Sequence, residues 1–138
     1  MIASVLMILT LLGGPSERTA DLTVTIPNLK TVKGEVVIAI YDQTEKFPKV
    51  GQTYRTVRFP VHSTSETYTI KGVKAGECAL AIYHDENSDG ECNSNFLGIP
   101  REGYGFSNNV KPVFSAPPYE ACVIRIPENS SISVKLIY

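Results

Sequence analysis

The most informative segment of the sequence is residues 35–41, Glu35-Val36-Val37-Ile38-Ala39-Ile40-Tyr41, which follows a glycine. In an extended chain successive side chains point to opposite faces. Both faces of this stretch are then apolar, with Val36, Ile38 and Ile40 on one and Val37, Ala39 and Tyr41 on the other. Because such a strand must be covered on both sides, the stretch predicts a central strand rather than an edge strand.

The same two-residue period recurs outward along most of the chain. It predicts further strands at residues 22–26, 57–61, 68–70, 78–84, 122–126 and 132–138. Pro60 indicates an edge strand, because proline cannot donate a ladder hydrogen bond. Residues 44–47 predict one helical turn that ends at Pro48. About seven short strands separated by turn residues predict an all-β fold: a single immunoglobulin-like or transthyretin-like antiparallel β-sandwich.

Length and charge restrict the class of protein. The chain has 138 residues, with 13 Lys and Arg against 14 Asp and Glu, and a formal net charge of −1. This is the length of one domain. A nucleic-acid-binding protein would carry a basic patch, so we expect no nucleic-acid partner. The hydrophobic content of 43% is typical of a globular chain.

The N-terminal segment resembles a secretory signal peptide. Residues 2–12 form an apolar run that is too short to span a bilayer as a helix, and small or helix-breaking residues follow it. We therefore expect residues 1–20 to be the signal peptide and residues 21–138 to be the domain. The mature protein would then be periplasmic or extracellular and would have no membrane span.

The cleavage site and the n-region leave alternatives open. A cut after Ser16 fits the preference for small residues better than a cut after Ala20, because Arg18 lies three residues before the second cut. No Lys or Arg precedes the apolar run. A buried N-terminal strand, or a start codon assigned too late, is therefore the alternative to a signal peptide.

A polar segment at residues 85–95 fits the first half of a calcium-binding loop. Oxygen-bearing residues alternate, and Gly90 occupies the sixth position of the pattern D-x-[DN]-x-[DN]-G. The predicted ligands are Asp85, Asn87, Asp89, Glu91 through its backbone carbonyl, Asn93 and Asn95. The twelfth position, normally a bidentate Glu, is Phe96, so we expect a weak Kd of roughly 10⁻⁴ to 10⁻³ M. A metal-free series of Asx-turns is the alternative.

Residues 96–109 are rich in Gly, Asn and aromatic residues and show no alternation. A loop of this length is often functional. Together with the preceding histidine it predicts a ligand surface for an envelope carbohydrate or a peptide, formed by His84, Tyr104, Phe106, Asn108 and Asn109. In the alternative, the aromatic residues of the loop fold back as a lid over one end of the sandwich.

No motif indicates catalysis. The chain has only two histidines, and it lacks the metalloprotease, nucleophile-elbow and P-loop patterns. We therefore expect a non-catalytic protein with calcium as its cofactor. The alternatives are a cell-envelope enzyme that uses His84 and Asp85, and a structural module without a ligand. Two carboxylates across an open cleft would favour glycoside hydrolysis, whereas carboxylates that converge on one point would favour a metal.

Three cysteines suit an exported protein if two of them pair. Cys78 and Cys122 both lie on predicted strands with apolar neighbours, so they form the expected disulfide if those strands are adjacent. Cys92 would then be a free thiol in the polar loop. The alternative is that all three cysteines are reduced.

Several runs of this sequence resemble the signature of a bacterial family of exported proteins, catalogued as domain of unknown function 2141. They are YHDEN at residues 83–87, DG at 89–90, NFLGIP at 95–100 and EGYGFSNN at 102–109; residues 22–29, 34–41 and 47–48 agree as well. The resemblance covers essentially the whole mature chain and implies a signal peptide and a small β-sandwich. It implies no particular activity. The sequence departs from related patterns at Cys78, where transthyretin-like sandwiches place Tyr, and at Cys92 within the loop.

Overall fold

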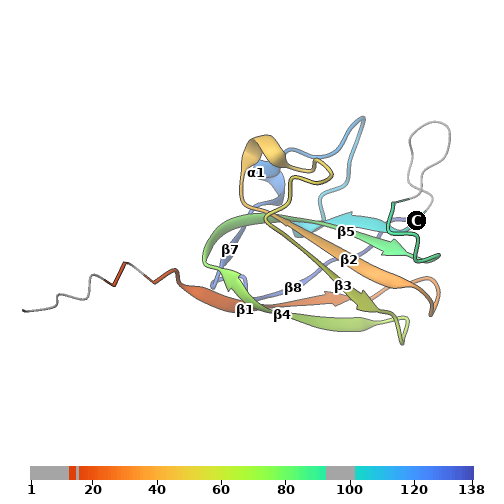
Figure 1. Ribbon diagram of the computed structural model, residues 1–138. Coiled ribbons are helices and arrows are strands. Elements are labelled where there is room, and N and C mark those ends of the chain that lie inside the picture. The colour runs from red at the N-terminus through yellow and green to blue at the C-terminus, as the bar shows by residue number, and fades with distance from the viewer. Residues whose placement is uncertain (1–12, 15, 93–101) are drawn as a thin grey trace, which may run out of the picture.

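The structure, a computed structural model, describes residues 13–14, 16–92 and 102–138, and it is an all-β sandwich (Figure 1). One sheet has three strands in the order β4 (Glu66–Lys74), β1 (Thr19–Ile26) and β8 (Ser131–Ser133). The other has five: β3 (Arg55–Pro60), β2 (Glu35–Tyr41), β5 (Gly76–Asp85) and β6 (Tyr104–Phe106) in that order, with β7 (Ile124–Ile126) paired to β5. The described helices are η1 (Thr44–Lys46), η2 (Ser107–Asn109) and α1 (Tyr119–Cys122). The predicted all-β sandwich is confirmed.

The main core lies between the two sheets and follows from the two-residue period. Fully buried side chains alternate along the strands, among them Leu22, Val24 and Ile26 of β1 and Val36, Ile38 and Ile40 of β2. β2 lies between β3 and β5, so the predicted central strand is confirmed, and β3 is the edge strand that Pro60 indicated.

A second apolar cluster covers the outer face of the five-stranded sheet. Its buried members are Tyr41, Phe47, Ala79, Tyr119 and Cys122. The ring of Phe47 lies 5.2 Å from Tyr41 and 6.0 Å from both Phe106 and Tyr119, all edge to face. Phe106, a member of the lid in the alternative for residues 96–109, packs from strand β6 against a sheet face rather than over an end of the sandwich. Phe96 and Leu97 of that lid lie outside the described residues.

Three strand predictions are wrong in detail. Residues 119–122 form helix α1, so only residues 124–126 of the predicted strand at 122–126 are extended. β8 covers only Ser131–Ser133 and runs parallel to β1, in contrast to the expected antiparallel arrangement. After β8, two backbone amides donate to side chains, Lys135 to Asn109 Oδ1 and Leu136 to Asn28 Oδ1, each at 2.8 Å. Ile137 then forms an isolated antiparallel bridge with Tyr104.

The predicted disulfide between Cys78 and Cys122 is wrong, because the two residues lie on opposite faces of one sheet. Cys78 belongs to the core between the sheets, and Cys122 belongs to the outer cluster. These two cysteines and Cys92 are all free thiols. Burial raises the pKa of both Cys78 and Cys122 to about 11, with the charge of Asp42 a smaller contribution at Cys78. Buried thiols of this kind are unreactive.

The first strand begins two residues before the predicted domain boundary. Thr19 pairs with Lys74 in the β1–β4 ladder, and Glu17 Oε1 lies 3.5 Å from Lys74 Nζ. A cut after Ser16 would keep these contacts, whereas a cut after Ala20 would remove the start of β1. Residues 1–12 and 15 of the predicted signal peptide lie outside the described residues. No helix in the described part of the chain is long and apolar enough to cross a membrane.

Candidate metal site

The pairing of β5 with β6 places the two ends of a long connection side by side. β5 ends at Asp85 and β6 begins at Tyr104, and Tyr83 and Tyr104 are directly paired across the two antiparallel strands. The backbone amide of His84 donates to the carbonyl of Gly103 at 2.7 Å. Asp85 and Glu102 are therefore neighbours although they are far apart in sequence.

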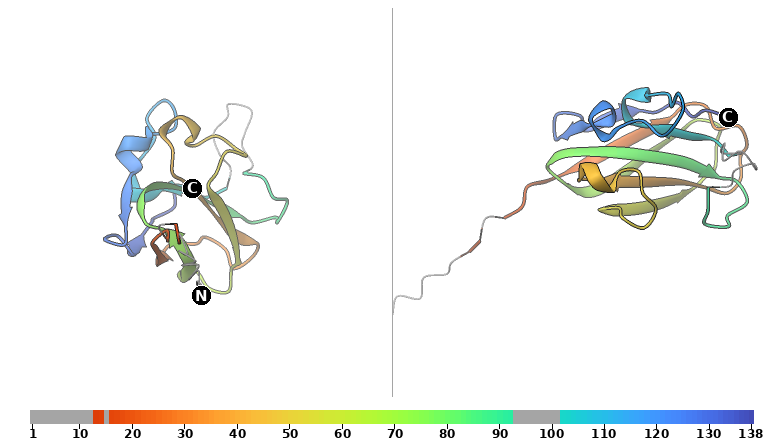
Figure 2. Two further views of the ribbon diagram at one scale, coloured as in Figure 1. Left: turned by 60° about the vertical axis from the view of Figure 1, so that its left-hand side comes forward. Right: turned by 90° about the horizontal axis from the view of Figure 1, so that it is seen from above.

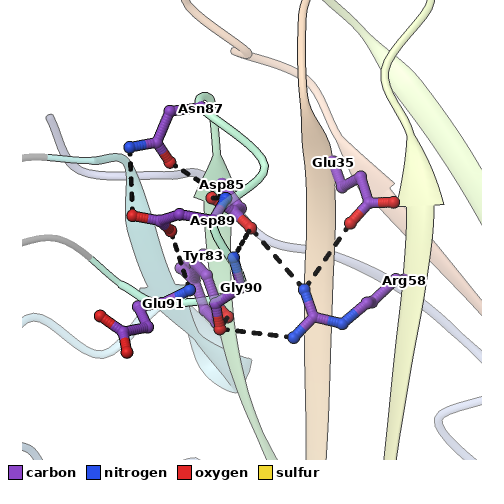
Figure 3. Close-up of polar contacts among 8 residues, drawn as sticks. All are labelled: Glu35, Arg58, Tyr83, Asp85, Asn87, Asp89, Gly90 and Glu91. Atoms are coloured by element: carbon purple, nitrogen blue, oxygen red, sulfur yellow. Dashed lines mark hydrogen bonds and ion pairs between the residues drawn. The ribbon is translucent and has the colours of Figure 1, made fainter.

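Asp85 is the centre of the loop that follows β5. Its side chain is fully buried. The backbone amide of Asp89 donates to Oδ1 at 3.2 Å, and that of Gly90 donates to Oδ2 at 2.8 Å (Figure 3). Gly90 has φ +81, a left-handed conformation that glycine adopts at little cost. A carboxylate offers about four lone-pair sites, so these two hydrogen bonds leave further sites on the same oxygens.

The rest of the loop contains the Asx-turns that the metal-free alternative predicted. Asn87 Oδ1 accepts the Asp89 amide at 3.4 Å, and Asn87 Nδ2 donates to Asp89 Oδ2 at 3.1 Å. Asp89 Oδ1 in turn accepts the Glu91 amide at 2.9 Å. The Glu91 carboxylate points away from Asp85 (Figure 3). Two further predicted ligands, Asn93 and Asn95, lie outside the described residues.

Three carboxylates converge at this site. Asp85, Asp89 and Glu102 each bring one carboxylate oxygen within 4.8 Å of the others. Glu102 is buried, with 6% of its surface exposed, whereas Asp89 is exposed. Like charges this close and partly removed from water repel strongly, so the arrangement favours a positive charge between them.

Glu102 is a member of the cluster that the sequence did not predict. It precedes β6, and residues 96–109 show no alternation that would have predicted this strand. A two-residue period there would have been the signal, because pairing with β5 brings Glu102 back to Asp85. Glu102 supplies the third carboxylate that the loop pattern lacks at its twelfth position.

Arg58 of the edge strand β3 reaches across to the loop. Its Nη1 lies 3.7 Å from Asp85 Oδ2 and 3.6 Å from Glu35 Oε2 (Figure 3). Its Nη2 donates to the carbonyl of Gly90 at 3.4 Å, and the Tyr83 hydroxyl donates to the same carbonyl at 3.0 Å. These bonds attach the loop to the face of the sheet, and one guanidinium is shared between two carboxylates.

The pKa of the Cys92 thiol is affected by the three nearby carboxylates. Cys92 is an exposed residue, but partial desolvation of its thiol raises the pKa to about 11, and the negative charges of Glu102, Asp85 and Asp89 contribute to the rise. At neutral pH the thiol is therefore protonated. The thiolate, which is the nucleophilic form, is then a minor species in the free protein.

His84 is not accessible to a ligand, whereas Phe106 and Asn109 of the predicted ligand surface line one groove. His84 is fully buried. Its Nε2 lies 2.8 Å from the carbonyl oxygen of Lys33, and its Nδ1 lies 3.1 Å from the Tyr138 hydroxyl and 3.7 Å from Glu86 Oε1. Both ring nitrogens therefore have partners within the protein, and the imidazole serves packing and hydrogen bonding.

The other members of that predicted surface mainly hold the chain together. Asn108 Nδ2 donates to the carbonyls of Ala121 and Val123, at 3.2 and 2.8 Å. Asn109 Nδ2 donates to the carbonyl of Ser133 at 3.1 Å. Both asparagines have left-handed backbone, with φ 62 and 53. Phe106 belongs to the outer cluster, and the partly exposed Tyr104 lies 6.2 Å from it, edge to face.

In a comparison with protein families, residues 24–135 match the family described as an uncharacterized protein conserved in bacteria, DUF2141. The chain belongs to this family. The resemblance inferred from the sequence is thereby confirmed. Comparison with curated proteins and with solved structures gives no match. The family match includes all three residues of the carboxylate cluster, so the site lies within the DUF2141 domain rather than in an added segment.

Proposed function

We propose that this DUF2141 protein is an exported, non-catalytic β-sandwich that binds calcium through Asp85, Asp89 and Glu102. The observation that carries the proposal is the convergence of the three carboxylate oxygens within 4.8 Å of one another. This is the converging arrangement that favours a metal over hydrolysis across an open cleft.

The donor set favours calcium among common cations. All three side chains offer oxygen, which hard cations prefer, and Ca²⁺ accepts irregular sets of six to eight oxygens. Mg²⁺ requires near-octahedral geometry, which an open loop supplies poorly. Zinc sites use thiolate or imidazole, whereas the three converging side chains are all carboxylates and His84 has both ring nitrogens engaged.

The position of the three ligands supports a structural role for the ion. Asp85 and Asp89 lie at the start of the connection between β5 and β6, and Glu102 lies at its end. One cation bound to all three carboxylates would link the two ends of that connection. Glu102 would take the part of the bidentate Glu that a standard loop places at its twelfth position.

Two observations support export without catalysis. The apolar run at residues 2–12 is followed closely by the first strand, which begins at Thr19, so a cut after Ser16 releases an intact domain. The buried His84 has no free nitrogen to act as a base. Mass spectrometry of the processed protein should find Glu17 at its N-terminus, and an unprocessed Met1 in the cytoplasm would contradict export.

Calcium titration of the mature protein tests the metal site. With a Kd of roughly 10⁻⁴ M, about 10 mM calcium should stabilise the folded state by about 2.7 kcal/mol. The melting temperature should then rise by several degrees. Asp89→Asn should abolish the rise, and the matched control Glu91→Gln should keep it. The proposal would be contradicted if calcium changed neither the melting temperature of the wild-type protein nor the heat measured by calorimetry.

A further inference from the structure

Three strongly exposed apolar side chains lie at the tips of two loops. Val50 is 98% exposed in the loop between β2 and β3, and Val113 and Phe114 are 83% and 102% exposed in the loop between η2 and α1. Both loops rise from the outer face of the five-stranded sheet, on the side away from the three-stranded sheet (Figures 1 and 2). Scattered exposed apolar residues are common, but these share one side of the molecule.

The bases of the two loops are held together by packing. Phe47 precedes the first tip and Tyr119 follows the second, and their rings lie 6.0 Å apart in the outer apolar cluster. Pro112, Pro117 and Pro118 restrict the backbone of the second loop. The two tips are therefore presented together from a fixed base, at little further cost in conformational entropy on binding.

Each tip carries a lysine beside its apolar residue. Lys49 precedes Val50, and Lys111 lies two residues before Val113; both lysines are exposed. Neither makes an ion pair within the part of the chain that the structure describes. Lys111 also lines a groove of about 480 Å³ with Lys135, and none of the described residues that line this groove is acidic. Acidic charge lies beside the first tip, because Val50 lines a second groove with Arg58 and Glu91. The positive charge is therefore clearest at the second tip, where Lys111 and Lys135 complement a negative surface.

We propose that these two loop tips dock the protein on an anionic lipid surface. Val50, Val113 and Phe114 enter the headgroup region, and Lys49 and Lys111 contact lipid phosphates. The convex shape of the tips favours a lipid over a protein partner, because a fluid interface deforms around projecting side chains whereas a protein would need matching cavities. The inference goes beyond calcium binding and does not depend on it.

Vesicle co-sedimentation in the presence of a chelator tests the proposal separately from the metal site. The mature protein should sediment with vesicles that contain phosphatidylglycerol and phosphatidylcholine, and much less with phosphatidylcholine alone. Binding should weaken at about 1 M salt, where the Debye length is about 3 Å. Protein that stays in the supernatant with both kinds of vesicle would overturn the proposal and would leave a protein partner as the occupant of the tips.

Paired variants locate the contact. The double variant Val113→Ser, Phe114→Ser should lower the vesicle partition coefficient about tenfold or more, because it removes the buried apolar surface. The control Val32→Ser changes a residue that is 54% exposed in the turn before β2, and it should bind as the wild type does. Because these positions are exposed, all variants should keep the wild-type melting temperature. Equal binding of the tip variant and the wild type would overturn the proposal.

Discussion

Arg58 and Asp85 form an ion pair that joins the edge strand β3 to the end of β5, with Nη1 3.7 Å from Oδ2. The arginine side chain is 41% exposed, whereas the aspartate side chain is fully buried. The guanidinium also lies 3.6 Å from Glu35 Oε2, so its charge is divided between two carboxylates. Arg58 is thus a cation already placed beside the oxygens that we propose as calcium ligands, and it opposes a metal ion there.

Changes to Arg58 and to Glu35 should therefore shift calcium affinity in opposite directions. Arg58→Gln removes the competing charge and should strengthen calcium binding, by up to about fivefold for a partly exposed pair. Glu35→Gln removes the second acidic partner of Arg58, so the guanidinium charge acts on Asp85 alone. Calcium binding should therefore weaken. Calorimetric titration of both variants measures the two effects. Shifts of the same sign would show that Arg58 acts on the fold of the loop rather than on its charge.

Glu102 should contribute as much to calcium binding as Asp89 does. Glu102→Gln preserves the size of this buried side chain and one carbonyl oxygen, but it removes a charge from the cluster. We expect the calcium Kd to rise about tenfold or more, which corresponds to at least about 1.4 kcal/mol. Glu91→Gln removes a charge from the same loop without touching the cluster and should leave the Kd unchanged. An unchanged Kd in Glu102→Gln would remove this residue from the site.

The sequence predicted the central strands because burial alone produces their pattern. Val36, Ile38 and Ile40 face the core between the sheets, and the alternate residues of β2 face the outer cluster or its surroundings. The residues of β6 show no such alternation of apolar side chains. A Cβ at Gly105 would lie 3.0 Å from Val134 Cγ1 and 3.2 Å from the Lys135 carbonyl oxygen, so close packing requires glycine where a strand pattern needs an apolar side chain.

The sequence predicted only those residues of the candidate site that lie close to one another along the chain. One turn contains four of the predicted residues, Asp85, Asn87, Asp89 and Gly90. Their spacing along the chain was enough to predict that turn. Glu102 reaches the cluster through the pairing of β5 with β6, a long-range contact that no local spacing encodes. For the same reason, the bonds from Asn108 and Asn109 to distant backbone carbonyls had no signal in the sequence.

The thiol of Cys92 should report calcium binding. Desolvation and the three nearby carboxylates hold its pKa at about 11, above the usual 9.0. A bound cation offsets the carboxylate part of that rise, so the pKa should fall, more thiolate should form at pH 8, and alkylation by iodoacetamide should accelerate. Each unit of pKa corresponds to about tenfold in thiolate well below the pKa. The buried Cys78 and Cys122 serve as internal controls that should stay unmodified.

Magnesium at the same ionic strength is the control for screening by salt, and it should accelerate the alkylation of Cys92 much less. If calcium raises the melting temperature but leaves the alkylation rate of Cys92 unchanged, the ion binds away from the three carboxylates. Peptide mass mapping after timed alkylation measures the rate at each cysteine.

Ile38→Asp should unfold the domain. Ile38 is fully buried between Val57 of β3 and Ile82 of β5, and its side chain belongs to the core between the sheets. An unpaired buried carboxylate costs several kcal/mol, which is comparable with a total stability of about 5 to 15 kcal/mol. Lys71→Asp places the same carboxylate on an exposed position of β4 and should retain the fold. Circular dichroism during thermal denaturation distinguishes the two outcomes.

Gly34 connects the packing of the sandwich to the candidate metal site. It has φ +69, and a Cβ there would lie 2.0 Å from the carbonyl oxygen of Asp85 and 2.7 Å from the Cα of Glu86. Gly34→Ala should therefore cost both the strain of a left-handed alanine, about 1 kcal/mol, and a backbone clash that displaces the end of β5. We expect the free energy of unfolding, measured by urea denaturation, to fall by at least about 3 kcal/mol, and calcium binding to weaken because Asp85 moves.

Gly51→Ala is the matched control: its φ is +77, but nothing in the described part of the chain lies within 4 Å of the added Cβ, so it should cost only the strain. The difference between the two variants measures the clash, and equal losses would show that the turn before β2 does not pack against Asp85.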